Sequence, residues 1–334
     1  MVIDFHTHVF PEKIAPRALE TLSGRSGGLR PVFDGTPDGL IRYLRRNRVD
    51  RAVVLNIATN PKQQAAVNDF AIAINEGRFT GGEQAAESAP AAMPEPDAST
   101  PATEPAHAAM PEPAAATEAT PAPESAAATE PAPAPTAMPE HAAASENPLI
   151  AFGSVYPFAP DALAELDRLH RAGIKGVKFH PEYQDFFVDD ERLFPLYRRI
   201  ASLGFVTVFH AGADVGYPKP VHSTPERLAK ALPQFGGAPV VASHFGGYIM
   251  WDDVERCLVG KDVYLDTSYT YARIPFFQAE QIVKNHGARR ILFGSDLPWS
   301  GVDGEAVLVE RLSLSPEERE LVFSGNALRL LGMK

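Results

Sequence analysis

Short runs of β-branched and aromatic residues recur along the chain, each followed by a longer stretch whose apolar residues are three or four positions apart. The short runs are typical of buried strands, and the longer stretches are typical of amphipathic helices. The pattern predicts eight strands, at residues 2–8, 52–57, 149–155, 176–180, 205–210, 239–244, 262–268 and 290–296. Each of these runs is short enough to be one strand of a sheet.

The stretches between these runs carry helical spacing. Residues 61–77 form one example, and residues 161–173 form another in which Leu163, Leu166 and Leu169 mark one face. Strands that alternate with helices in this way favour a closed parallel barrel over an open sheet. The sequence therefore predicts an α/β fold, a (β/α)8 TIM barrel.

Residues 81–147 interrupt this alternation. They contain thirteen prolines and eleven acidic residues but no lysine or arginine, and the phrase AAMPEP occurs twice. Dense proline removes helix and sheet hydrogen bonds, and almost none of these residues could build a core. We predict a disordered, low-complexity insertion between helix 61–77 and the third strand. A tolerated repeat expansion is favoured over a docking tract or spacer. Loops of that kind lie opposite the active site of a barrel, so the insertion should be far from it.

The rest of the chain, residues 1–80 and 148–334, has a suitable length for one barrel domain of about 250 residues. The whole chain has a net charge of −11, but without the insertion it has 31 acidic and 31 basic residues. All of the charge imbalance therefore belongs to the insertion. A neutral domain argues against a nucleic-acid partner.

The single cysteine, Cys257, excludes an internal disulfide and is typical of a reducing compartment. The chain begins with a strand pattern and lacks the basic and apolar regions of a signal peptide. No run approaches the ~18 apolar residues of a membrane span. These features predict a cytoplasmic protein without a membrane partner.

Histidines and other titratable residues stand at the carboxyl ends of five predicted strands. Side chains two apart share a face of a strand, and the carboxyl ends of barrel strands meet at one mouth. We therefore expect these side chains to converge. In chain order they are His6, His8, Lys178, His180, His210, His244 and Asp296.

The chemistry of this set favours a metal. A divalent metal of the zinc type binds neutral imidazole nitrogen and carboxylate oxygen, and a catalytic site leaves one position open for water. Three nitrogens and one oxygen would come from His6, His8, His210 and Asp296. Bound water would then have its pKa lowered towards about 7. The sequence predicts one divalent metal ion, with zinc preferred.

The motifs that carry these residues resemble the metal-dependent amidohydrolase superfamily, in the branch of amidohydrolase family 2 that includes aminocarboxymuconate-semialdehyde decarboxylase. They are DFHTHVFP, GVKFHP, VFHAG, SHFGG, FGSDLPW and GNALRLL. The similarity covers essentially the whole chain except residues 81–147. It implies a distorted barrel with a metal at its mouth, a small-molecule substrate and, since related enzymes are often dimers, a homodimer.

Carried over motif by motif, the resemblance implies metal ligation by His6, His8, His210 and Asp296. It also implies that His244 is an acid/base residue beside the metal. Asp296 is a second candidate for taking a proton from water, so both are catalytic candidates.

The number of metals depends on Lys178. In some superfamily members a lysine at the end of strand four is carboxylated and bridges two metals. Here His180 follows on the same face, and the branch named above is similar to a one-metal pattern. One metal is therefore favoured over two. Lys178 and His180 then become candidates for binding a substrate carboxylate or oxyanion.

Three functions fit these observations. The favoured one is a metal-dependent hydrolase in which metal-activated water attacks the carbonyl of a small amide, lactone or ester. The alternative is a non-oxidative decarboxylase, a carboxy-lyase, of a small aromatic or unsaturated acid, which would use the same ligands. The lack of obvious long strand-to-helix loops favours the hydrolase. A non-catalytic barrel is disfavoured, because the metal-binding set is intact.

Overall fold

The computed structural model describes residues 1–79, 147–217 and 220–333, which belong to one compact unit of the chain. The predicted low-complexity insertion, 81–147, lies outside these residues except for Asn147. The Asn147 side chain donates to the carbonyl oxygen of Ile74 (2.5 Å), near the end of helix α3 (Gln64–Asn75). The insertion therefore connects a helix to a strand, as predicted.

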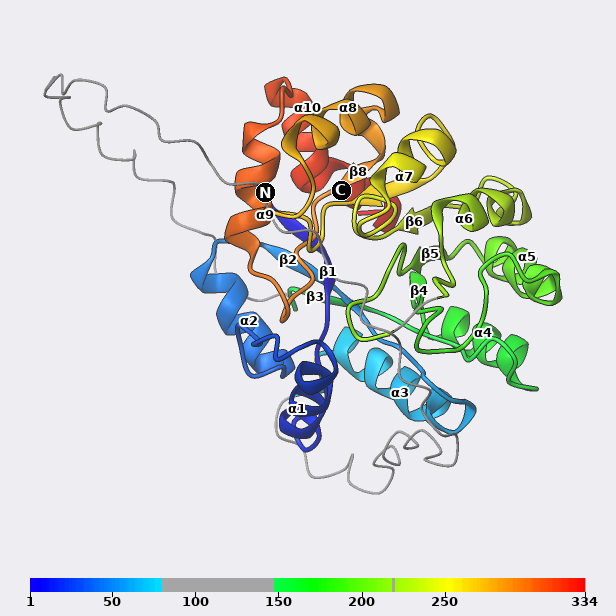
Figure 1. Ribbon diagram of the computed structural model, residues 1–334. Helices are drawn as coiled ribbons and strands as arrows, with labels where there is room; N and C mark the ends of the chain where they lie inside the picture. Colours follow the sequence, from blue (N-terminus) through cyan, green and yellow to red (C-terminus); the bar gives the residue numbers. More distant parts are fainter. Residues whose placement is uncertain (80–146, 218–219, 334) are drawn as a thin grey trace, which may run out of the picture. The chain divides into compact units, whose positions relative to one another are not determined.

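Parallel strands form the centre of the described unit (Figure 1), which confirms the predicted barrel. Each predicted run contains most or all of one observed strand, and every strand ends earlier than predicted because the last residues of each run turn into the loops at the mouth. The strands are β1 (Ile3–Thr7), β2 (Arg51–Leu55), β3 (Leu149–Phe152), β4 (Gly176–Phe179), β5 (Val206–Phe209), β6 (Val240–Ala242), β7 (Tyr264–Asp266) and β8 (Ile291–Leu292).

Two joints close the barrel. Regular parallel pairing links β1 to β3 and β4 to β8 as two sheets. Between β3 and β4, the Lys178 N–H donates to the carbonyl of Gly153 (2.8 Å). Between β8 and β1, the Asp296 N–H donates to the carbonyl of His6 (2.8 Å). The second joint brings together two predicted metal ligands that are 290 residues apart.

Helices follow the strands and cover the outside of the barrel (Figure 1). Two of them start with a threonine cap and a proline in the first turn, since Thr36 and Thr224 accept hydrogen bonds from backbone N–H groups of α2 and α6. The helices are α1 (Ala15–Arg25), α2 (Pro37–Arg46), α3, α4 (Ala162–Arg171), α5 (Phe194–Ser202), α6 (Pro225–Ala231), α7 (Trp251–Cys257), α8 (Phe276–His286), α9 (Val302–Arg311), α10 (Pro316–Glu320) and α11 (Asn326–Leu331).

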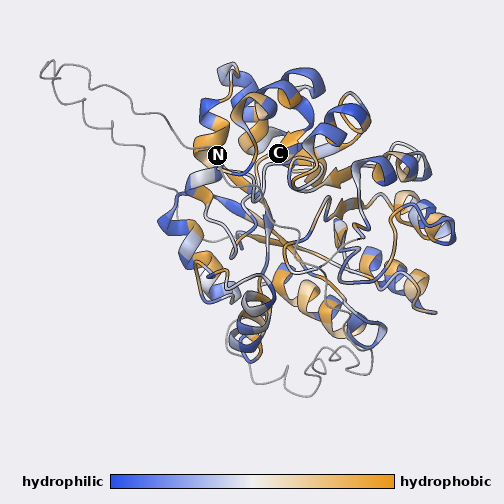
Figure 2. Ribbon diagram, viewed as in Figure 1, coloured by the Kyte–Doolittle hydropathy of each residue, from blue (hydrophilic) through white to orange (hydrophobic). Residues whose placement is uncertain are grey.

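Helices turn their apolar residues toward the strands (Figure 2). In α4, Leu166 and Leu169 are fully buried, but Leu163 is 49% exposed. The predicted face of this helix was therefore wrong at Leu163. The reason is geometric, because residues six positions apart point about 120° away from each other around a helix.

A glycine lets two loops meet beside the site. Gly212 follows β5 and has a φ of 84°, and a Cβ atom there would lie 2.2 Å from the backbone nitrogen of Tyr248. The Tyr248 N–H donates to the carbonyl of Ala211 (2.8 Å). This contact brings the loop that starts at His210 against the loop that starts at His244.

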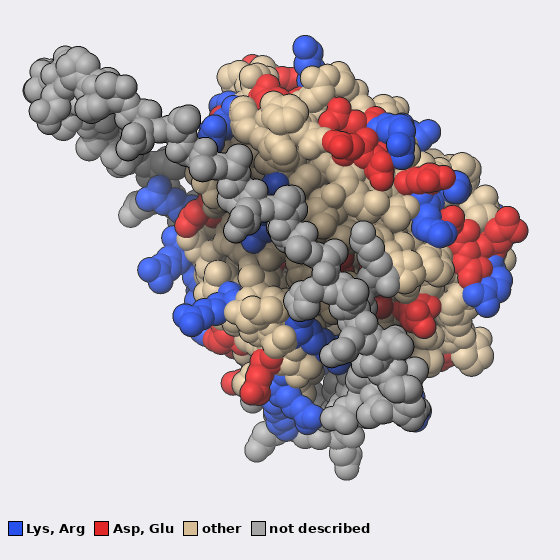
Figure 3. Space-filling view, viewed as in Figure 1, with Lys and Arg blue, Asp and Glu red and all other residues tan. Residues whose placement is uncertain are grey.

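On the face seen in Figure 3, acidic and basic side chains are interspersed around the described unit, in agreement with its balanced composition. In the part of the chain that the structure covers, every helix is too short or too polar to cross a bilayer.

Candidate metal centre

The residues singled out in the sequence lie at or just beyond the carboxyl ends of their strands. Most are buried, and His8 and Asp296 keep some exposure. The structure brings them together in groups whose possible ligand atoms lie within 4.8 Å of one another. One group is His6, His8 and Asp296, and another is His180, His210 and Asp214.

In the first group, three acceptor atoms face one another. His6 Nδ1 lies 3.0 Å from Asp266 Oδ2, and His8 Nδ1 lies 2.9 Å from the carbonyl oxygen of Leu55. Because those oxygens accept, each neutral imidazole carries its proton on Nδ1 and keeps a lone pair on Nε2. The two Nε2 atoms lie 3.3 and 3.2 Å from Asp296 Oδ1. The Nε2 lone pairs of both imidazoles therefore face the same carboxylate oxygen.

This arrangement fits a cation. Burial lowers the pKa of His6 to about 3, so its imidazole is neutral. Burial opposes the ionisation of Asp296, but its contacts with the surrounding histidines, first His8, outweigh burial and lower the pKa of Asp296. Tetrahedral zinc with ligands at about 2.0–2.1 Å has edges of about 3.3–3.4 Å. The donor types and the spacing both suit a divalent metal of the zinc type.

His210 also presents a bare nitrogen. His244 Nδ1 donates to the carbonyl of Ser268 (2.9 Å), which leaves His244 Nε2 to accept from His210 Nδ1 (3.1 Å). The proton of His210 is then on Nδ1, and its Nε2 keeps a lone pair. Within the described residues, this buried Nε2 has no hydrogen-bond partner and lies 4.0 Å from Asp214 Oδ2.

His180 is a neutral hydrogen-bond donor. Its Nδ1 accepts from the N–H of Tyr183 (3.4 Å), so its Nε2 carries the proton and faces Asp214 Oδ2 at 3.4 Å. The ring stacks on those of Tyr183 and His210, with centroids 3.7 and 4.1 Å away. Burial and then the charge of Lys178 hold the pKa of His180 well below its usual range.

Lys178 supplies a cation inside the site. It is fully buried, and its Nζ lies 3.4 Å from His6 Nε2 and 3.3 Å from Ser243 Oγ. Burial lowers the pKa of Lys178 to about 8, while the charges of Asp266 and Asp296 act in the opposite direction. The amine is therefore mostly protonated at neutral pH and can donate toward an oxyanion.

Two carboxylates of the site were not predicted. Asp214 Oδ2 lies 3.4 Å from His180 Nε2, and Glu182 Oε2 lies 3.7 Å from the other ring nitrogen of His180. Both follow a strand-end histidine, in VFHAGAD and in KFHPE. An acidic residue two to four positions after a strand-end histidine was the sequence feature that could have predicted these two carboxylates. Asp266, at the end of β7, also bonds to His6.

Glu182→Gln is expected to change how stability depends on pH. Burial raises the pKa of Glu182 from 4.5 to about 7. The stability that this carboxyl contributes is present below about pH 4.5 and is lost as the pH rises through about 7, because the folded protein holds the proton more tightly. The loss is on the order of 3 kcal/mol. Glutamine cannot ionise, so the variant should not lose this stability as the pH rises.

Urea unfolding at pH 5 and pH 8, with a chelator present, measures this effect. Relative to the wild type, the glutamine variant should gain about 2–3 kcal/mol between pH 5 and pH 8. Glu226→Gln, at an exposed position, serves as the control. If the unfolding free energies of the glutamine variant and the wild type differed by the same amount at pH 5 and at pH 8, Glu182 would not titrate in this way.

Solved structures with the same architecture cover nearly the whole chain. An uncharacterized TIM-barrel protein from Bordetella bronchiseptica has a TM-score of 0.65 at 17% identity, with 99% of this chain and 98% of that chain covered. The 5-carboxyvanillate decarboxylase from Sphingomonas paucimobilis has a TM-score of 0.60 at 12% identity, with 100% and 99% covered.

A structure from Pseudomonas putida, described as a candidate 2-pyrone-4,6-dicarboxylic acid hydrolase, has a TM-score of 0.56 at 15% identity, with 99% and 97% covered. At these identities the likeness establishes the fold. None of the curated proteins compared with this chain matches it. The amidohydrolase family model matches residues 3–333, almost the full length, and this chain therefore belongs to the amidohydrolase family.

Proposed function

We propose that this member of the amidohydrolase family is a metal-dependent hydrolase that acts on the carbonyl of a small amide, lactone or ester. The observation that carries the proposal is that the Nε2 atoms of His6 and His8 lie 3.3 and 3.2 Å from Asp296 Oδ1, while their Nδ1 atoms face oxygens of Asp266 and Leu55. Three hydrogen-bond acceptors at this separation repel one another unless a cation binds them. In the proposal, one divalent metal ion, with zinc preferred, is held there.

His210 is the proposed fourth ligand. Its Nε2 is a buried lone pair without a partner in residues 1–79, 147–217 and 220–333. Buried polar atoms are rarely left unpaired, so this unpaired nitrogen, which the structure groups with His180 and Asp214, supports a ligand role. The bond from His210 Nδ1 to His244 would hold this ring in the tautomer that a metal needs.

The remaining residues have separate proposed tasks. When bound, the metal would acidify water and polarise the carbonyl. His244 Nε2 accepts from His210 Nδ1, and on release of that bond it can take a proton and return it to the leaving group, with Asp296 as a second proton acceptor. Lys178 can stabilise the developing oxyanion. His180, through its Nε2–H, can orient a substrate oxygen.

Decarboxylation of a small aromatic or unsaturated acid is the second candidate. The buried cation of Lys178 is suited to hold a carboxylate, and the same metal ligands would serve. A solved decarboxylase shares the fold, as does a structure described as a candidate hydrolase. The two reactions differ in their product, so the product decides between them.

The test is a panel of small amides, lactones, esters and unsaturated or aromatic acids, each incubated with metal-loaded protein. We expect hydrolysis, detected as base consumption at constant pH, without carbon dioxide in the headspace. Stoichiometric carbon dioxide from an acid would overturn the hydrolase proposal and support the decarboxylase. Metal-stripped protein is the control and should be inactive in both assays.

A further inference from the structure

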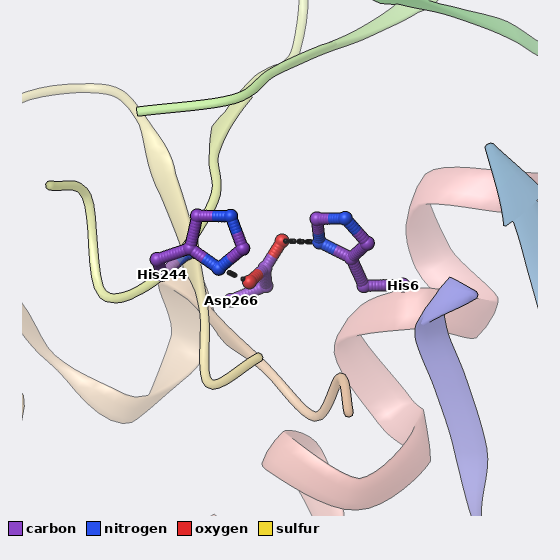
Figure 4. A group of neighbouring side chains, drawn as sticks. All are labelled: His6, His244 and Asp266. Carbon is purple, nitrogen blue, oxygen red and sulfur yellow. Dashed lines mark hydrogen bonds and ion pairs between the residues drawn. The ribbon is translucent and has the colours of Figure 1, made fainter. Parts of the chain in front are cut away.

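A hydroxyl group joins two of the site histidines below the proposed metal. Asp266 lies between His6 and His244, with one carboxylate oxygen directed to each (Figure 4). The hydroxyl of Ser268, two residues further along, lies 2.9 Å from the Nδ1 atoms of both histidines. It also donates to Asp266 Oδ1 (2.5 Å). Asp266 and Ser268 are fully buried.

The hydrogen-bonding capacity of this hydroxyl is used completely. A serine hydroxyl has one proton to donate and two lone pairs. Its proton goes to Asp266, so it can only accept from His6 Nδ1 and His244 Nδ1. Both ring nitrogens must therefore carry protons, which agrees with their other contacts to the Asp266 carboxylate and the Ser268 carbonyl.

The carboxylate of Asp266 is equally saturated. Its Oδ1 accepts from the backbone N–H groups of His244 (3.0 Å) and Ser268 (3.1 Å) as well as from the hydroxyl, and its Oδ2 accepts from His6. The bond to His244 N also holds a backbone with a φ of 59°, in the left-handed region. A buried network with every donor and acceptor paired has little freedom to rearrange.

We propose that Asp266 and Ser268 are positioning residues that set the same tautomer in His6 and His244 and so couple the metal-holding ring to the proton-transferring ring. With Nδ1 protonated in both, His6 keeps a lone pair on Nε2 beside Asp296, and His244 uses its Nε2 to accept from His210 Nδ1. A flip of either ring would leave the hydroxyl facing a lone pair, so one ring cannot change tautomer without disturbing the other. This inference rests on the proposed function, because it assigns His6 to the metal.

Ser268→Ala tests the inference. In the alanine variant, His6 Nδ1 can still donate to Asp266 and His244 Nδ1 to the backbone carbonyl of residue 268. The hydroxyl that accepts from both nitrogens is gone, so nothing then links the tautomers of the two rings. We expect the zinc dissociation constant, measured by chelator competition, to rise by about 10–100-fold. In nitrogen-15 spectra of the metal-free protein, the Nδ1-protonated signals of both histidines should weaken together.

Ser268→Thr keeps the hydroxyl and should restore zinc affinity and both signals. Ser324→Ala is the matched control, because that buried serine donates only to its own helix, at Glu320. It should leave affinity and spectra unchanged.

Unchanged zinc affinity and unchanged tautomer signals in Ser268→Ala would overturn the inference, as would a change in only one of the two histidines. If wild-type protein bound no zinc, the proposed function would fail instead, and the tautomer signals would still report on the coupling. Circular dichroism on all variants identifies any loss of folding, and the threonine variant then carries the test.

Discussion

Asp296→Ala is expected to lower the metal content of purified protein from about one ion per chain to nearly none. The substitution removes the only carboxylate of the His6, His8 and Asp296 group. The neutral imidazoles of His6, His8 and His210 would then hold a dication without a compensating charge. Elemental analysis of metal-reconstituted and desalted protein gives the metal-to-chain ratio directly.

Two further variants give this measurement its controls. Asp214→Ala removes a carboxylate from the neighbouring group and should leave the ratio at about one. Loss of metal there, with retention in Asp296→Ala, would place the ion on His180 and His210 instead. A wild-type ratio near two that falls in Lys178→Ala would contradict the one-metal assignment.

His244→Asn is expected to slow turnover by about 10²–10⁴-fold, the usual contribution of a general acid–base group. Asparagine can still donate to the Ser268 carbonyl that now accepts from His244, but it cannot take up a proton. The metal content should therefore stay near the wild-type value while kcat falls. Steady-state kinetics with the substrate identified by the panel, together with elemental analysis, separate the two effects.

His170→Asn is the control for this substitution, because His170 is an exposed histidine on α4. It should leave both kcat and metal content unchanged. Wild-type turnover in His244→Asn would remove His244 from the catalytic machinery. If metal-loaded protein turned over no member of the panel faster than metal-stripped protein, a non-catalytic barrel would become the better explanation.

The strands were the most predictable part of the fold. A run such as AVVLNI is apolar on both faces, which only a strand between helices and a filled barrel interior requires, and the structure places β2 there. Strand ends were less predictable, because the last residues of each run bond to loops. The face of α4 shows the same limit, since Leu163 is apolar yet exposed.

The positions of the site residues were also predictable, because strand-end residues of a parallel barrel meet at one mouth. Their grouping was not. Period-two alternation put His6 and His8 on one face, and the structure groups both with Asp296, but it groups His210, predicted as a ligand of the same metal, with His180 and Asp214. The pairing of His210 with His244 depends on the close contact of two loops, which no local pattern encodes.

The sequence by itself determined the barrel, the family and the set of side chains at the mouth, because hydrophobic periodicity and strand-end residues are local properties of the chain. Only the tertiary structure decided which nitrogen of each histidine is bare. A tautomer is fixed by the partner of the other ring nitrogen, and the partners of His6 and His8, Asp266 and Leu55, are 260 and 47 residues away. Contacts of that separation exist only once the barrel is closed.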